Sequence, residues 1–155
     1  MAPGSKDDLA KAKNIVFHLL KYRARSQKEI QDRLRQKNFS QTTIDQVIDF
    51  CYKLDLIDDE AFASSWLNSR LRKPFGLRRI FFELKTKGIS EEIIEQAQYK
   101  IKDNYNEYEV VLELAKERLS KLKRLEPDKA KGRVYGFLMR RGFSPDIVNE
   151  VIREL

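Results

Sequence analysis

The sequence has 155 residues, of which 41% are apolar and 35% charged, and its net charge is +7. This composition is typical of an ordered protein whose partner is anionic, such as a nucleic acid or an acidic protein surface. No apolar run approaches the roughly 20 residues of a membrane-spanning helix, and the opening MAPGSKDDLAKAK lacks the apolar core of a secretory signal. We therefore expect a cytoplasmic protein that does not contact a membrane.

Three segments of the chain repeat one pattern of apolar residues. They align on Ser40, Ser90 and Ser144, at spacings of 50 and 54 residues. Spacings of three and four residues between apolar side chains place them on one helical face, so each segment predicts two helices joined by a tight corner. The positions that coincide are Ile30, Ile80 and Val134; Leu34, Leu84 and Leu138; Phe39, Ile89 and Phe143; Ile44, Ile94 and Val148; and Val47, Ala97 and Val151.

The first unit opens with a helix predicted over residues 9–22. Ser26 and Glu29 have the spacing of a capping box, which predicts the start of a middle helix. Asn38 stands where a helix end favours a left-handed residue. Ser40 then follows as the cap of a third helix.

The second unit opens with a helix predicted over residues 59–71. Pro74 and Gly76 interrupt the chain before the middle helix. Gly88 and Ser90 repeat the corner of the first unit, with glycine in the left-handed position.

The third unit opens with a helix predicted over residues 110–123. Pro127 is suited to the first turn of the middle helix, and Gly142 with Ser144 forms the corner.

The predicted fold is therefore all-α, an elongated and curved array of three tandem three-helix repeats. No segment shows the sustained alternation of a strand, so no sheet is expected. The expected parts are a flexible N-terminus, 1–8, and the three repeats 9–57, 58–105 and 106–155.

Charge alternates in sign along these repeats. Residues 6–37 hold ten basic and four acidic residues, 69–89 hold seven and one, and 114–141 hold ten and three. Helix ends explain part of this alternation, because N-termini attract acids and C-termini attract bases. They do not explain the cations gathered before the second middle helix, so we infer a basic stripe along the middle helices.

The centre of the stripe is the run RLRKPFGLRRIFFELKTK, residues 70–87, in which Glu83 is the single acid. An alternative role for Arg70 is to pair with Asp58 or Asp59. Trp66 is expected to anchor the core of the second unit. Phe75, next to a proline in a loop, is expected to be exposed and to pack on a partner. The residues expected to contact a partner are Arg70, Arg72, Lys73, Phe75, Arg78, Arg79, Lys85 and Lys87.

The sequence favours a protein that is not an enzyme. Cys51 and His18 are the single residues of their types, so they provide neither a zinc set nor a basis for a disulfide. We expect both to be structural, with Cys51 in the core. The acidic cluster 58–60 is interpreted as a helix start rather than a metal site, and no glycine-rich phosphate loop is present. No cofactor and no metal are expected.

The segment Leu54–Ser90 closely resembles the signature of the RecX family, bacterial modulators of the RecA recombinase. The resemblance implies a protein that binds RecA filaments on single-stranded DNA along the helical groove. It also implies that the protein inhibits ATP hydrolysis and strand exchange or promotes filament loss, and so has a role in recombination, DNA repair and the SOS response. We expect the protein to act as a monomer. The matching features are the Asp-Asp-Glu lead, Phe62, Ala63, Trp66, Arg70, the basic loop with Gly76, Ile80, Leu84, Lys87, Gly88 and Ile89.

Two other interpretations remain open from the residues alone. One is a tandem helix-turn-helix-like module that binds single-stranded or duplex DNA directly through its basic middle helices. Its weakness is the lack of paired Asn, Gln and Arg side chains for base recognition. The other is a scaffold for an acidic protein.

Overall fold

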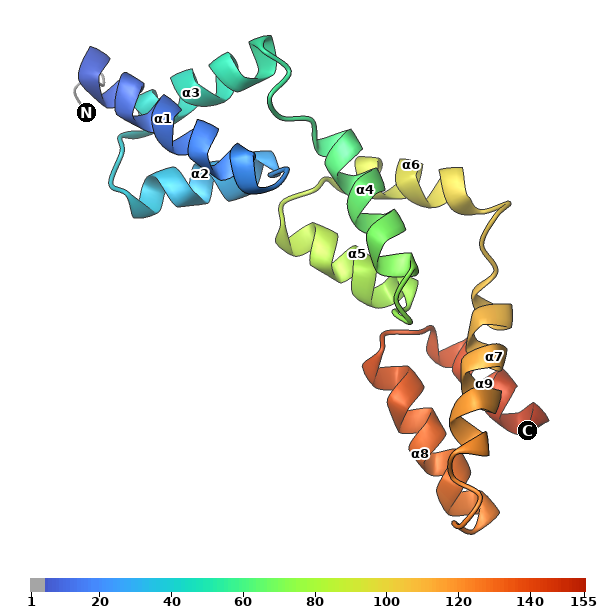
Figure 1. The fold of residues 1–155 in the computed structure, drawn as a ribbon. Coiled ribbons are helices and arrows are strands. Elements are labelled where there is room, and N and C mark those ends of the chain that lie inside the picture. The colour runs from blue at the N-terminus through green and yellow to red at the C-terminus, as the bar shows by residue number, and fades with distance from the viewer. Residues whose placement is uncertain (1–4) are drawn as a thin grey trace.

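The computed structural model describes residues 5–155, and every regular element in that range is a helix. The helices form three consecutive groups of three, which confirms the predicted all-α array of three-helix repeats (Figure 1). Their bounds are α1 Lys6–Tyr22, α2 Gln27–Gln36, α3 Gln41–Lys53, α4 Asp59–Leu71, α5 Leu77–Thr86, α6 Glu91–Ile101, α7 Glu107–Ser120, α8 Pro127–Arg140 and α9 Pro145–Glu154.

The first helix begins earlier than the predicted residue 9. Ser5 is its N-cap, and its Oγ accepts a hydrogen bond from the N–H of Asp8 at 3.0 Å. Of the segment 1–8 that was expected to be flexible, residues 1–4 lie outside the described residues. The remainder belongs to the cap and first turn of α1.

The helix corners have the backbone conformation that the sequence predicts. The φ angle is 66° at Asn38, 81° at Gly88 and 83° at Gly142, all in the left-handed region that ends helices. The capping box at the start of α2 is also confirmed. The Glu29 N–H donates to Ser26 Oγ at 3.2 Å, and the Ser26 N–H donates to Glu29 Oε1 at 3.2 Å.

The serine after each corner caps the third helix of its unit in two of the three cases. Ser40 and Ser90 each accept a hydrogen bond from the N–H three residues further on, at 3.2 and 3.3 Å. The Ser144 side chain makes no such bond. Its N–H donates instead to Glu107 Oε1, at 2.9 Å, which ties the third corner to the start of α7.

Each unit has its own apolar core. The helices pack within their unit, α1 and α2 on α3, α4 and α5 on α6, and α7, α8 and α9 on one another. Cys51 is buried in the first core, as predicted. His18 is exposed, and its ring meets Tyr22 edge-on at 5.1 Å. The most buried large side chains are Ile30, Leu34 and Ile44 in the first core, Leu67, Ile80 and Leu84 in the second, and Val134, Leu138 and Phe143 in the third.

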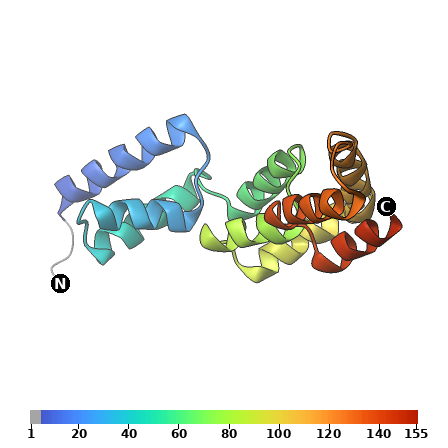
Figure 2. The ribbon, with the colours of Figure 1, turned by 90° about the horizontal axis from the view of Figure 1, so that it is seen from below.

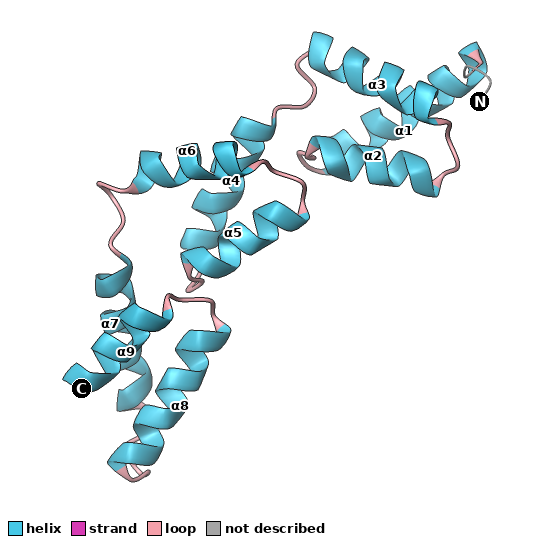
Figure 3. Cartoon of the chain, turned by 180° about the vertical axis from the view of Figure 1, so that it is seen from behind, coloured by secondary structure: helices cyan, strands magenta, loops and turns pink. Residues whose placement is uncertain are grey.

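The units follow one another along an elongated, curved molecule (Figure 1). The middle helices α2, α5 and α8 succeed one another along the inner side of the curve, whereas α3 and α6 lie on the outer side (Figure 3). The view from below shows the same lengthwise order from the N-terminal to the C-terminal unit (Figure 2). The middle helices, along which the basic stripe is expected, therefore share one side of the molecule.

Adjacent units are joined end to end through their middle helices. Ser26 Oγ, at the start of α2, donates to the carbonyl oxygen of Lys87 at the end of α5 (2.7 Å). The Gly76 N–H, at the start of α5, donates in the same way to the carbonyl oxygen of Arg141 at the end of α8 (2.8 Å). Each positive helix N-terminus thus meets a negative helix C-terminus, a favourable arrangement of dipoles.

Candidate functional site

Glu83 is the centre of the surface formed by the end of α4 and the face of α5. Its carboxylate accepts hydrogen bonds from Arg70 Nη2 (2.6 Å), Trp66 Nε1 (2.9 Å) and Arg79 Nε (3.3 Å). Burial opposes the charge on Glu83, but the hydrogen bonds from Arg70 and Trp66 outweigh it and lower the pKa of this carboxyl. The single acid of the basic run therefore stays ionised and holds three side chains in place.

The alternative pairing of Arg70 with Asp58 or Asp59 is wrong. Arg70 lies in the last turn of α4, whereas the two aspartates begin that helix, about 17 Å away at 1.5 Å per residue. Asp58 instead caps α4 through the N–H of Ala61 (3.1 Å). Asp59 accepts from the N–H of Gln27 (2.9 Å), so it connects the first two units.

Phe75 is half-buried, so the expectation that it is exposed is also wrong. The guanidinium groups of Arg70, Arg79 and Arg141 lie 4.2, 4.3 and 5.1 Å from the centroid of its ring. Arg141 comes from the third unit, and the residue after Phe75 bonds to its carbonyl oxygen. The ring thus gathers three cations rather than offering a free apolar surface.

Trp66 lies at the edge of the second core rather than in its centre. It stacks on Phe62, with 5.9 Å between the ring centroids, but remains half-buried. Lys87 Nζ lies 4.5 Å from the Trp66 ring and 3.4 Å from Glu29 of the first unit. One face of the indole therefore belongs to the candidate surface.

The eight predicted contact residues divide into two groups. Arg70, Arg79 and Lys87 are held by Glu83 or Glu29, and Phe75 is covered by guanidinium groups. The other four are cations outside this cluster. Lys85 forms a solvent-exposed ion pair with Glu91 (3.3 Å). Within residues 5–155, the remaining three form no ion pair; they are Arg72, Lys73 and Arg78.

Phe82 is the feature of this surface that sequence reasoning missed. It is 70% exposed on α5, between a hollow lined by Arg78 and Lys85 and a second one lined by Trp66. The buried positions of α5 are Ile80 and Leu84, and the residue midway between them must point away from the core. That spacing could have identified an exposed Phe82 among the cations.

Within residues 5–155, no helix is long and apolar enough to cross a membrane. In the same range, no group of three or more His, Cys, Asp or Glu side chains is placed to hold a metal ion.

The fold and this surface define a class of protein, a tandem array of three-helix units whose second unit presents cations and the exposed Phe82 at the middle helix α5. Family models for the first, second and third three-helix domains of RecX match residues 12–51, 58–97 and 105–152. The chain belongs to the RecX family of regulatory proteins.

Individual relatives resemble the chain along nearly its whole length. The regulatory protein RecX of Amycolatopsis mediterranei is 35% identical over 146 residues, which cover 93% of this chain and 82% of the relative. That of Prosthecochloris aestuarii is 32% identical over 154 residues, covering 97% of both. The crystal structure of RecX from Lactobacillus salivarius superimposes with a TM-score of 0.82 at 28% identity, covering 97% of this chain and 98% of that one.

Proposed function

We propose that this protein binds RecA–DNA filaments along their helical groove and inhibits ATP hydrolysis and strand exchange, and so modulates recombination and DNA repair. Family membership and the signature in Leu54–Ser90 support this proposal. The observation that carries it is the succession of three basic middle helices along the inner side of one curved molecule. Such an array can contact several protomers of a helical polymer at once.

The mechanism follows from that geometry. A protein bound to successive protomers opposes the relative movements that ATP hydrolysis requires, and its bulk in the groove obstructs a second DNA. Arg72, Lys73, Arg78 and Lys85 supply charge for encounter with an anionic surface. Phe82 supplies the apolar anchor, because an exposed aromatic side chain within a polar rim is the usual centre of binding energy.

Phe82→Ala tests this mechanism without disturbing the core. We expect it to raise the concentration for half-maximal inhibition of the DNA-dependent RecA ATPase about tenfold or more, the effect of losing an aromatic anchor. Tyr99→Ala is the matched control, since Tyr99 is 67% exposed in the same unit but lies on α6, on the outer side of the curve. Equal effects of the two changes would contradict the proposal.

Binding to single-stranded DNA, duplex DNA and nucleotide-bound RecA filament over a salt series separates the proposal from a plain DNA-binding module. Affinity for the filament far above that for naked DNA supports regulation through RecA. Equal affinities, with a steep salt dependence for each, would favour the DNA-binding module.

A further inference from the structure

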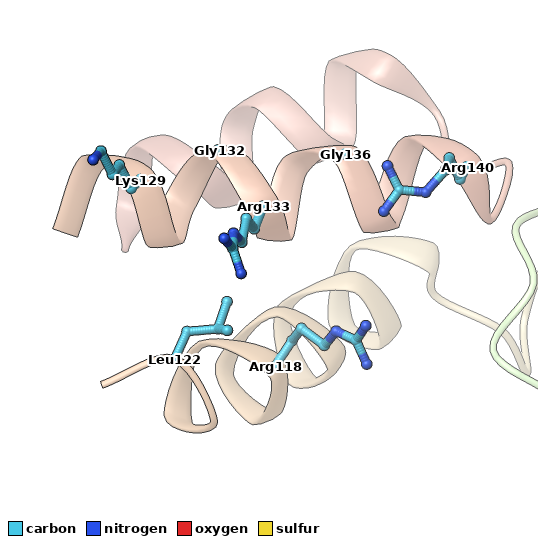
Figure 4. Close-up of a pocket in the computed structure, with 7 residues that line it drawn as sticks. All are labelled: Arg118, Leu122, Lys129, Gly132, Arg133, Gly136 and Arg140. Atoms are coloured by element: carbon cyan, nitrogen blue, oxygen red, sulfur yellow. The ribbon is translucent and has the colours of Figure 1, made fainter. Parts of the chain in front are cut away.

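A hollow between α7 and α8 in the third unit is lined by cations and contains no acid. Arg118 and Leu122 of α7 face the surface of α8, and Arg133 points into the space between the two helices (Figure 4). The guanidinium groups of Arg118 and Arg140 lie toward one end of the hollow, and Lys129 lies toward the other. The full lining is Arg118, Leu122, Lys129, Gly132, Arg133, Gly136 and Arg140.

The four cations of this hollow are uncompensated. Among the residues that the structure describes, none of the four forms an ion pair. An acid does lie nearby on α7, but Glu117 pairs with Lys121 at 3.5 Å. Four like charges around one concavity repel one another, and an anion placed among them relieves that repulsion.

Two glycines shape the hollow. An added Cβ at Gly136 would lie 3.0 Å from Arg140 Nη1, so this glycine lets the guanidinium fold back across the helix. At Gly132 an added Cβ would meet nothing within 4 Å, so the space above it is open. Glycine in a helix interior is less stable than alanine, yet both glycines of α8 lie on the face that lines the hollow.

Aromatic packing orients one of the cations. The Arg118 guanidinium lies 4.2 Å from the centroid of the Phe137 ring, and Arg141 lies 5.1 Å from the same ring. A guanidinium held against an aromatic face keeps its N–H groups free at its edge, where they can bind an oxyanion bidentately.

The equivalent hollows in the other two units are lined by acids as well as cations. At the repeat spacings of 50 and 54 residues, Arg133 corresponds to Glu29 in the first unit, and Gly136 corresponds to Asp32. Both acids line the first unit's hollow. In the second unit, Phe82 occupies the position of Gly136, and Glu83 lies beside it. Of these three equivalent hollows, only that of the third unit is free of acids.

We propose that the α7–α8 hollow binds consecutive phosphates of a nucleic-acid backbone. Three guanidinium groups and an ammonium match phosphodiester oxygens, and the absence of acids suits a ligand with a charge at every residue. An acidic peptide fits less well, because its carboxylates are spaced irregularly on flexible side chains. The proposal does not depend on RecA, because the contact is made with DNA directly.

The test uses the full chain and fluorescein-labelled oligothymidylate, alone and as a duplex, without recombinase. We expect the double variant Arg133→Gln with Arg140→Gln to bind at least about tenfold more weakly. A plot of log affinity against log salt concentration should also become less steep, by about 0.7 for each single-strand phosphate that is no longer neutralised. Lys11→Gln with Lys21→Gln on α1 is the matched control, because it removes the same charge from two exposed lysines elsewhere. We expect the control to change binding less than about twofold.

Gly132 provides a second, independent variant pair. Gly132→Glu places a carboxylate in the hollow and is expected to abolish the same binding, whereas Gly132→Ala fits the open space and is expected to bind normally. Circular dichroism of both variants is the check that they are folded. The proposal would be overturned if the double variant in the hollow and the double variant on α1 lost the same DNA affinity. Normal DNA binding by Gly132→Glu would also overturn it. A third contradicting result would be that the substitutions in the hollow weaken binding of polyglutamate but leave binding of DNA unchanged.

Discussion

Glu29 shows how a single acid in a basic surface can hold two units together. Arg23 forms a two-point ion pair with its carboxylate, the Ser26 N–H donates at 3.2 Å, and Lys87 Nζ of the second unit lies at 3.4 Å. Burial alone would raise the pKa of Glu29, but the Arg23 and Ser26 hydrogen bonds and the Lys87 charge lower it to about 2. The stabilising charge is therefore retained in moderately acidic solution.

The Glu29 carboxylate makes stability depend on pH with a definite sign. Its folded-state pKa lies below the unfolded value of about 4.3, so its contribution is complete above that value and is lost as the pH falls toward 2. We expect Glu29→Gln to lower the free energy of unfolding by about 1–3 kcal/mol near pH 7. Urea unfolding at several pH values should show this deficit shrinking below about pH 4.

The control for this prediction is an exposed ion pair on α3. Asp49 and Lys53 are 2.9 Å apart with both side chains mostly in solvent. Asp49→Asn should therefore change the free energy of unfolding by less than about 0.5 kcal/mol. A Glu29→Gln deficit that stayed constant over the whole pH range would contradict the assigned role of its charge.

At the scale of the element, Ser26 acts both as a helix cap and as a link between units. Ser26→Ala removes the cap of α2 and the hydrogen bond to the Lys87 carbonyl. Ser90→Ala removes a cap alone, since among residues 5–155 its Oγ only accepts the hydrogen bond from the Ile93 N–H at the start of α6. Each cap that is removed costs about 1 kcal/mol, and we expect Ser26→Ala to cost about 1 kcal/mol more by urea unfolding. Equal losses would mean that the link contributes nothing.

The glycine at the third corner tests the junction between the second and third units. Gly142 has a φ of 83°, and a Cβ there would lie 2.2 Å from the Cβ of Arg79. We expect Gly142→Ala to lower the free energy of unfolding by about 1–3 kcal/mol, from backbone strain and this clash. Gly132→Ala, in open space on α8, should instead raise it by about 0.5–1 kcal/mol. Thermal unfolding of the two variants gives the comparison, and a neutral Gly142→Ala would show that the corner can rearrange.

At the scale of the whole molecule, separate cores and end-to-end junctions produce an elongated shape (Figure 2). A compact domain of 155 residues would have a radius of gyration of about 15 Å. We expect small-angle scattering to give a clearly larger value, because the units are placed in a row. A radius near the compact value would mean that the array closes on itself in solution.

The candidate surface was predictable in position but only partly in detail. The middle helix of the basic run 70–87, α5, does lie on the inner side of the array. The alternative ion pair of Arg70 and the exposure of Phe75 were predicted wrongly, because the groups they contact, Glu83 and Arg141, lie 13 or more residues away, on another helix or in another unit. Local spacing carries no information about such pairs.

The sequence alone determined the helices, their corners and the threefold repetition. Asn38, Gly88 and Ser26 act on neighbouring residues, because left-handed ends and capping hydrogen bonds span no more than one helical turn. The tertiary structure decided which cations are held and which are free. It also placed Phe82 among them and formed a cationic hollow without acids in the third unit. These outcomes depend on how helices and units meet, and those contacts join residues far apart in the chain.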